Sequence, residues 1–379
     1  MREKKGGRSL MKNGAVQSLV ASLICIVIGL LVGYVVLLFI NPAGAWDAIM
    51  TVLKNFWYYP TPQAAMKYFG NTLVKTAPLL LCSLSVLFAY KVGLFNIGAA
   101  GQYVAGAGAC LYCALALQLP WYVCLVAAMA AGALLGALSG LLKAYCNVNE
   151  VISCIMLNWI SLYLVNMLLT QVKENASPYT NVVKNYNATA LLPGLGLGSL
   201  FSNNQYVTIA VPLAILVAVG IWVLLEKTKL GYELRATGSN KFAARYCGMR
   251  EKRNLILTMV IAGALAGLAA ATLYLTGFEQ WECTRSSVPG MGFNGIAAAF
   301  LGGLNPIGAI FSSYFIEHIT SGGAYVDKTM YCAQISDFIS ALIIYLCGFV
   351  LFFKQYMNLR MTRKEERLRA AASQEGGDR

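Results

Sequence analysis

Apolar runs of about 20 residues, separated by short polar stretches, repeat along most of the chain. A run of this length spans the hydrocarbon core of a bilayer as a helix. About ten such segments are predicted, at 17–40, 71–90, 94–118, 121–143, 151–170, 206–226, 254–276, 289–304, 305–320 and 334–353. We therefore expect an all-α, polytopic membrane protein.

Two of these regions, 94–118 and 289–320, are rich in Gly and Asn. Membranes accept interrupted helices only where protein or a cavity covers the freed backbone, so broken or re-entrant segments are expected here. GLFNIGAAGQ (93–102) also resembles GFNGIAAAFLGGLNP (292–306). The likeness favours two pseudo-repeated halves, with chance similarity between Gly/Ala-rich segments as the alternative.

Small residues recur at helical spacing in two other runs. Gly132, Gly136 and Gly140 are four residues apart, as are Gly263 and Gly267. In lipid, such ladders let helix backbones approach closely. They predict tight helix packing rather than a binding site.

Positive charge is distributed unequally between the loops. Ten crossings from a cytoplasmic N-terminus place 22 of the 29 Lys and Arg residues on the cytoplasmic side, leaving 7 outside. This agrees with the positive-inside rule, so the net charge of +13 reflects the membrane rather than nucleic acid. The predicted organisation is a cytoplasmic segment 1–16, a membrane domain 17–353 with outer loops 41–70 and 171–205 and a cytoplasmic loop 227–253, and a basic cytoplasmic tail 354–379.

Several kinds of chemistry have no sequence signature. No Walker A pattern occurs, and the only GxGxxG, at 290–295, lies in a membrane segment without a preceding strand. Neither catalytic residues nor a metal site is predicted.

Glu317, His318 and Asp337 lie near segment ends, where a paired structural role and a proton relay both remain open. The cysteines are expected to be packed thiols, although Cys283 and Cys332 could pair.

Neutral amides dominate the polar groups within the apolar runs. Such side chains offer donors and acceptors to an uncharged polar solute, and neighbouring Phe rings can stack on a sugar or a base. Pairing between helices would equally satisfy them. The predicted substrate path comprises Phe95, Asn96, Gln102, Asn158, Phe293 and Asn294.

The basic segment GYELRATGSNKFAARYCGM (231–249) lies between two apolar runs. Ser239 or Asn240 can cap a helix of about two turns, and Gly248 can follow its last turn. Phe242 and Tyr246 then share one face, beside a basic edge. Such a surface helix could lie on anionic lipid or dock into a groove of another protein.

This segment resembles the coupling-helix loop of ABC importer permeases of the ribose and nucleoside type. The similarity extends to NTLVKTAPLLLCSLSVLFAYKVGLFNIGAAGQ (71–102), NVNEVISCIMLNWI (147–160) and GMGFNGIAAAFLGGLNPIGAIF (290–311), and it is greatest to the larger permease subunit of nucleoside importers. The similarity is weaker in the loop 171–205 and beyond Lys354.

The resemblance implies a non-catalytic permease in the cell membrane, coupled to a separate ATPase that binds ATP and Mg²⁺. It also implies a second permease subunit, an extracytoplasmic substrate-binding lipoprotein and a nucleoside substrate. The expected ATPase-coupling residues lie in and before the helix near 239–248: Glu233, Arg235, Asn240, Arg245 and Tyr246. The alternatives are a simple-sugar importer of the same architecture and, less favoured, a secondary carrier or channel, for which 231–249 would be a membrane-surface helix.

Overall fold

The computed structural model describes residues 14–327 and 329–331. Beyond them it describes only positions 338, 341, 342, 345, 346, 349, 352, 353, 355–360, 362, 363 and 366. Asp337 and Cys332 therefore lie outside the described residues, as do residues 1–13 and most of the predicted span 334–353. Cys283 is a free, buried thiol.

Helices form all the regular structure in the described part of the chain, apart from two isolated β-bridges. The longer helices are α2 (Gly14–Ile40), α3 (Ala45–Lys54), α4 (Pro62–Lys91), α5 (Ala99–Leu115), α6 (Trp121–Cys146), α7 (Glu150–Leu169), α10 (Ala210–Lys227), α11 (Lys229–Ser239), α13 (Glu251–Tyr274), α14 (Met291–Leu301) and α15 (Pro306–Gly323). The shorter ones are η1 (Asn55–Tyr58), η2 (Thr170–Val172), α8 (Val183–Tyr186), η3 (Ala188–Ala190), α9 (Leu197–Leu200) and α12 (Lys241–Tyr246).

Six of the described helices are long and apolar enough to cross a membrane: α2, α4, α6, α7, α10 and α13. The expected all-α, multi-span class is thus confirmed, whereas the count of about ten spans is not. The helix α14, with 11 residues, is shorter than a full span, and α5, with 17, is at the lower limit of spanning length. The helix α4 begins nine residues before the predicted span, inside the predicted outer loop, because Thr61 caps it and Pro62 occupies its first turn.

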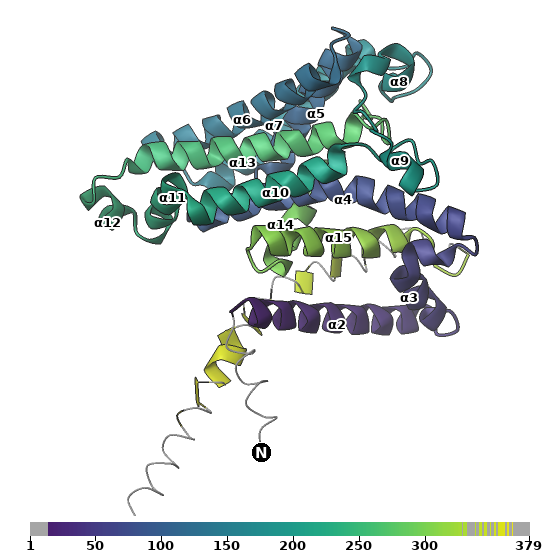
Figure 1. Cartoon of the computed structure of the whole chain (residues 1–379), viewed down its shortest axis with the longest axis horizontal. Helices are drawn as coiled ribbons and strands as arrows, with labels where there is room; N and C mark the ends of the chain where they lie inside the picture. The colour runs from purple at the N-terminus through teal and green to yellow at the C-terminus, as the bar shows by residue number, and fades with distance from the viewer. Residues whose placement is uncertain are drawn as a thin grey trace, which may run out of the picture.

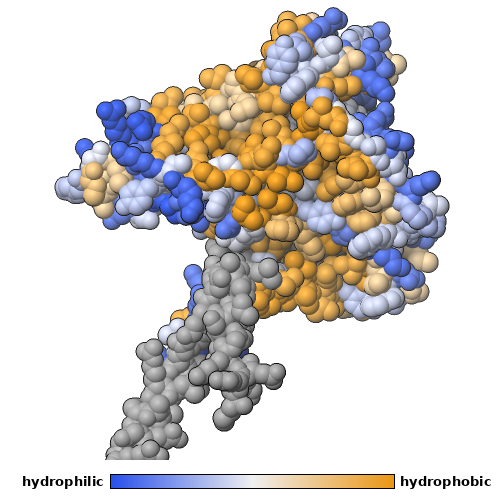
Figure 2. Space-filling model, viewed as in Figure 1, coloured by the Kyte–Doolittle hydropathy of each residue, from blue (hydrophilic) through white to orange (hydrophobic). Residues whose placement is uncertain are grey.

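The long helices lie roughly side by side in layers (Figure 1). The main core gathers buried side chains of α4, α5 and α13, while a second cluster joins α2 and α3 to α14 and α15. Apolar side chains cover the flank of the molecule between two polar ends, one of them formed by α11 and α12 (Figures 1 and 2). This distribution is what a protein surrounded by lipid requires.

The helices α6 and α13 make the most extensive contact in the fold, and it is built on glycine. A Cβ atom added at Gly263 would overlap the carbonyl oxygen of Gly132, and one added at Gly132 would overlap that of Gly263. One added at Gly136 would overlap the carbonyl oxygen of Met259. The predicted packing role of both ladders is therefore confirmed.

Two helix breaks occur near the regions where interruptions were expected. The chain is non-helical from Val92 to Gly98, before α5, and again between α14 and α15. Gly292 at the start of α14 packs directly on Ala100 at the start of α5, so the two regions meet. Phe95 and Asn96 lie in the first break, whereas Phe293 and Asn294 lie inside α14. The similar sequence pairs therefore have different backbone structures.

Candidate functional site

The segment 228–250 folds as two short helices that project from one end of the bundle (Figure 1). The first, α11, starts at Thr228, whose hydroxyl accepts a hydrogen bond from the Gly231 N–H at 3.0 Å. Gly231 lies against the backbone of Leu224 and Leu225 at the end of α10, which a side chain would prevent. The chain therefore turns back tightly from α10 into α11.

The second helix, α12, has the caps that the sequence predicts. Asn240 Oδ1 accepts hydrogen bonds from the N–H groups of Phe242 and Ala243, both at 3.0 Å. Gly248 follows the helix with φ of 80°, a conformation that favours glycine. The only buried residue of α12 is Ala244, so the helix presents almost its whole surface outward.

We expect Asn240→Ala to unfold α12 locally, because it removes the acceptor for two helix N–H groups. Losing such a cap costs about 1 kcal/mol, which a six-residue helix cannot replace from its own packing. Amide hydrogen exchange of residues 241–246 in the purified protein measures the effect. Asn240→Asp keeps the acceptor and should preserve protection; equal exchange in both variants would contradict this role for the cap.

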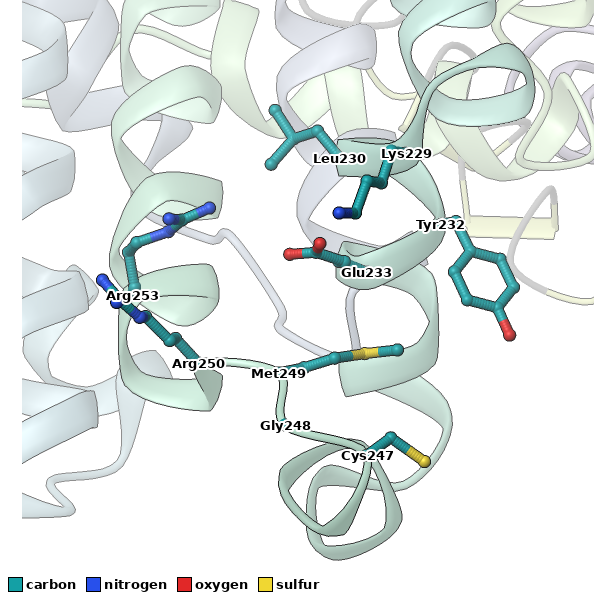
Figure 3. Close-up of a pocket in the computed structure, with 9 residues that line it drawn as sticks. All are labelled: Lys229, Leu230, Tyr232, Glu233, Cys247, Gly248, Met249, Arg250 and Arg253. Atoms are coloured by element: carbon teal, nitrogen blue, oxygen red, sulfur yellow. The ribbon is translucent and has the colours of Figure 1, made fainter.

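A groove of about 690 Å³ lies between α11, the end of α12 and the start of α13 (Figure 3). Lys229 and Glu233 face it from α11, and Arg253 faces them from α13, while Tyr232 points away. Met249 projects below them, after Gly248. The remaining lining residues are Leu230, Cys247, Gly248 and Arg250. The groove is thus basic overall, with apolar surface from Leu230 and Met249.

The predicted coupling residues take different structural positions. Arg245 and Tyr246 are exposed at the projecting end, with 94% of Tyr246 accessible. Arg235 instead turns inward, where its Nη1 donates to Glu226 Oε2 at 2.9 Å and ties α11 to α10. Glu233 faces the groove and Asn240 caps α12. Tyr246 is therefore fully accessible to a partner that docks on the tip, and Arg245 is accessible there beside Glu251, whose Oε1 lies 3.9 Å from the Arg245 Nη1.

Several groove residues were missed by the sequence reasoning. Lys229, Arg250 and Arg253 lie outside the quoted motif or at its edge, and they become neighbours only because α11 folds back beside α13. The excess of basic residues in 227–253 was the available signal. A lysine or arginine count along a loop does not reveal which side chains share a groove.

The helix α11 is also fixed to the bundle on its inner side. Asn254 Nδ2 of α13 donates to Thr237 Oγ1 at 2.9 Å, in a buried position. Gly238 packs on the backbone of Val92 and Gly93, at the point where α4 ends. These two residues begin the first helix break, which continues to Gly98. The projecting loop therefore touches the chain at the start of this break.

The predicted path amides form a buried network around the same break. Asn96 Nδ2 donates to Ser85 Oγ at 3.0 Å and to Gln102 Oε1 at 2.9 Å. Asn158 Oδ1 accepts from the Gly101 N–H at 2.8 Å, and its Nδ2 donates to the Ile97 carbonyl at 3.1 Å. Asn158 thus replaces helical hydrogen bonds that the broken backbone lacks, whereas Asn96 pairs with other side chains. In this conformation they therefore hold the break together.

The two Phe residues and Asn294 lie closer to accessible surface. Phe293 is exposed, while Phe95 and Asn294 are half-buried. Gly292, the neighbour of Phe293, touches Ala100, so the start of α14 and the Asn96 network belong to one region. The structure thus brings the predicted path residues near one another, although it leaves most of their amides already paired.

The ionisable residues of α15, buried Glu317 and half-buried His318, have local partners. Glu317 accepts a hydrogen bond from Ser321 Oγ at 2.8 Å. His318 Nε2 lies 2.9 Å from the Leu53 carbonyl oxygen, and its Nδ1 lies 3.2 Å from Asn55 Nδ2. These contacts join α15 to α3 and η1. They favour the structural role over the proton relay for His318.

Comparison with known proteins identifies relatives over most of the chain. Guanosine ABC transporter permease protein NupP of Bacillus subtilis is 32% identical over 333 residues, covering 86% of this chain and 92% of NupP. Glucose ABC transporter permease protein TsgB13 of Haloferax volcanii is 31% identical over 299 residues, covering 76% and 78%. A second guanosine permease protein of B. subtilis, NupQ, is 30% identical over 254 residues, covering 64% and 77%.

No solved structure matches the chain. Residues 68–348 match the family described as the permease component of the branched-chain amino acid transport system. That match spans well over half of the sequence and includes both helix breaks and the loop of α11 and α12. The protein is therefore a multi-pass membrane protein that belongs to this family of transport-system permease components.

Proposed function

We propose that this chain is a non-catalytic permease subunit of an ATP-driven importer that takes up nucleosides. The main support is the similarity to NupP, which extends over 86% of this chain and carries the guanosine name. Neutral amides and aromatic rings around the helix breaks suit an uncharged solute with a base and a ribose. Access to the path would require the Asn96 network to rearrange during transport.

A separate ATPase subunit, which binds ATP and Mg²⁺, would dock on α12 and drive this rearrangement. Support comes from the exposure of Arg245 and Tyr246 and from the contact of Gly238 with the end of α4. The excess of basic residues on this side favours a cytoplasmic position for the loop and both termini. About ten crossings remain part of the proposal, with α5, α14 and α15 packed within the membrane domain.

Two further partners complete the proposed importer. A second permease subunit is supported by the similarity of this chain to both NupP and NupQ, two guanosine permease proteins of one bacterium. An extracytoplasmic substrate-binding lipoprotein would deliver the nucleoside at the opposite end from α12. Membrane lipid would surround the apolar flank (Figure 2).

Glucose or another simple sugar is the second candidate substrate, favoured by the similarity to TsgB13. Uptake of radiolabelled guanosine, uridine, glucose and ribose separates the two, measured in cells that express the whole importer with and without this permease. We expect permease-dependent nucleoside uptake that other nucleosides compete and sugars do not. Uptake of sugars alone would mean that the substrate is a sugar and not a nucleoside. It would not affect the proposed coupling to an ATPase.

Arg245→Glu tests the coupling proposal in the same cells. Reversing an exposed charge at the docking tip should abolish most nucleoside uptake without reducing the amount of permease in the membrane. Arg245→Lys keeps the positive charge and is the matched control. If Arg245→Glu transports normally and no ATPase copurifies with the wild-type protein in mild detergent, the chain is a carrier or channel.

A further inference from the structure

The groove beside α11 lies at the boundary between the apolar bundle and its polar end. Lys229 and Leu230 follow α10 almost directly, and Arg250 and Arg253 lie at the start of α13. Both α10 and α13 are long and apolar enough to cross a membrane. At about 1.5 Å of rise per residue, these groove residues lie within about 5 Å of the ends of the two apolar helices. The headgroup layer on each side of a bilayer is about 5–7 Å thick, so the groove lies at headgroup depth.

Aromatic side chains mark the same level on neighbouring helices. Lys227, the last residue of α10, lies over the Trp222 ring, 5.7 Å from its centroid. Lys252 of α13 lies over the ring of Tyr145, near the end of α6, 4.6 Å from its centroid. Trp and Tyr are enriched where a membrane meets water. The ends of α6 and α10 and the start of α13 thus place the membrane surface beside the groove.

The groove carries more positive charge than its own residues neutralise. Lys229 faces Arg253 across it, one from α11 and the other from α13 (Figure 3). Arg250 also lines it, and none of these three cations forms an ion pair with another residue that the structure describes. Glu233 is the one carboxylate among the lining residues. The excess of two positive charges favours an anionic ligand.

The rest of the lining suits a phospholipid better than an inorganic ion. Leu230 and Met249 add apolar surface, and a volume of about 690 Å³ is typical of sites for small organic molecules. Figure 2 shows hydrophilic residues of this end bordering the apolar flank, along which acyl chains can lie. The Glu233 carboxylate repels a bare phosphate but accepts a hydrogen bond from a hydroxyl. The lining therefore fits a phosphodiester that carries hydroxyl groups and acyl chains.

We propose that this groove binds the headgroup of an anionic phospholipid of the phosphatidylglycerol type. Basic pockets between membrane-spanning helices are a recurrent form of anionic-lipid site. Arg253, with its planar array of donors, and Lys229 hold the phosphodiester from opposite walls, and Glu233 accepts from a glycerol hydroxyl. The bound lipid bridges α11 to α13 and so fixes the projecting loop against the bundle. This site does not depend on which solute the permease carries.

Native mass spectrometry tests the site, on the purified permease alone and on the complex with the subunits that copurify with it. Phosphatidylglycerol added in mild detergent should fill one high-affinity site. Lys229→Gln combined with Arg253→Gln should weaken binding about 30-fold, because each basic residue near an anionic lipid contributes about fivefold. The matched control is Lys227→Gln with Lys252→Gln, which removes the same charge at the same level outside the groove and should bind like the wild type. Equal weakening in both double variants would mean general attraction to the surface and would overturn the proposal.

Competition separates the lipid from a soluble phosphate and from a protein partner. Glycerol 3-phosphate, at the same concentration as the lipid, should not displace it; displacement would mean that the groove takes a soluble phosphate instead. Lipid on the permease alone but absent from a complex that contains the ATPase would mean that the ATPase fills the groove, and would also overturn the proposal. The measurement on the permease alone does not depend on the proposed coupling to an ATPase.

Glu233→Gln tests the headgroup contact. The wild type should bind phosphatidylglycerol more tightly than phosphatidic acid, whose phosphate monoester has more negative charge and no glycerol headgroup. Glu233→Gln should lose this preference, because the repulsion of the bare phosphate is removed, whereas Glu233→Asp keeps the charge and should keep the preference. Tighter binding of phosphatidic acid by the wild type, or the same preference in Glu233→Gln, would overturn the assigned headgroup.

Discussion

Gly263→Ala is expected to destabilise the folded permease by about 3 kcal/mol, the upper end of the usual cost of overpacking. The added methyl group would overlap the carbonyl oxygen of Gly132, which is backbone and cannot rotate away. The helices α6 and α13 would have to separate along the largest contact in the fold. The loss should appear as a lower midpoint when the purified protein is heated in detergent and its monodisperse fraction is followed.

The matched control is Gly220→Ala on α10. Gly220 also lies within a long apolar helix, but an added Cβ meets nothing within 4 Å. This substitution should be neutral or stabilise the protein by about 0.5–1 kcal/mol, because alanine favours the helix over glycine. Equal melting of the two variants would mean that the α6–α13 contact relaxes around a methyl group, contrary to the geometry.

Gly238→Ala is expected to lower nucleoside uptake about 5- to 150-fold while the importer still assembles, the range for coupling free energies of about 1–3 kcal/mol. An alanine Cβ would lie 2.5 Å from the carbonyl carbon of Val92, whereas ordinary contacts begin near 3.4 Å. The helix α11 would have to move away from the end of α4 by about 1 Å. Movement of α12 would then be transmitted more weakly to the first helix break, because the contact between Gly238 and Val92 would be looser.

Uptake and assembly have to be measured together for this variant, with the ATPase content of the purified complex as the assembly readout. Ser239→Ala, next in the chain and exposed, is the control and should transport normally. Unchanged uptake in Gly238→Ala would exclude the contact with Val92 as a transmission point. Loss of the ATPase from the complex would place the defect in docking instead.

Features set by neighbouring residues were predictable from the sequence. The α12 helix is an example, since Asn240 and Gly248 define its ends through local hydrogen bonds and a local φ. The glycine ladders of α6 and α13 were equally readable from their spacing. The α11 helix was missed because Gly231 and Gly238 lower its intrinsic helix propensity. Its stability comes from contacts with α10, α13 and the end of α4, which no local pattern reveals.

The polar amides illustrate the limit for the candidate site. Asn96 pairs with Gln102 six positions away, whereas Asn158 pairs with backbone groups 57 and 61 positions away. Composition identifies both as buried polar groups that need partners, but it does not distinguish a solute from another helix.

The length of α12 has a thermodynamic consequence. Six residues cannot form a stable isolated helix, so α12 exists only while Asn240 and its single buried residue, Ala244, hold it in place. A subunit that binds only the helical form of α12 stabilises that form. By linkage, the free energy by which binding stabilises the helix equals the free energy by which helix formation strengthens binding. The order of α12 and the affinity for its partner should therefore rise and fall together, so that a change at either one is felt at the other.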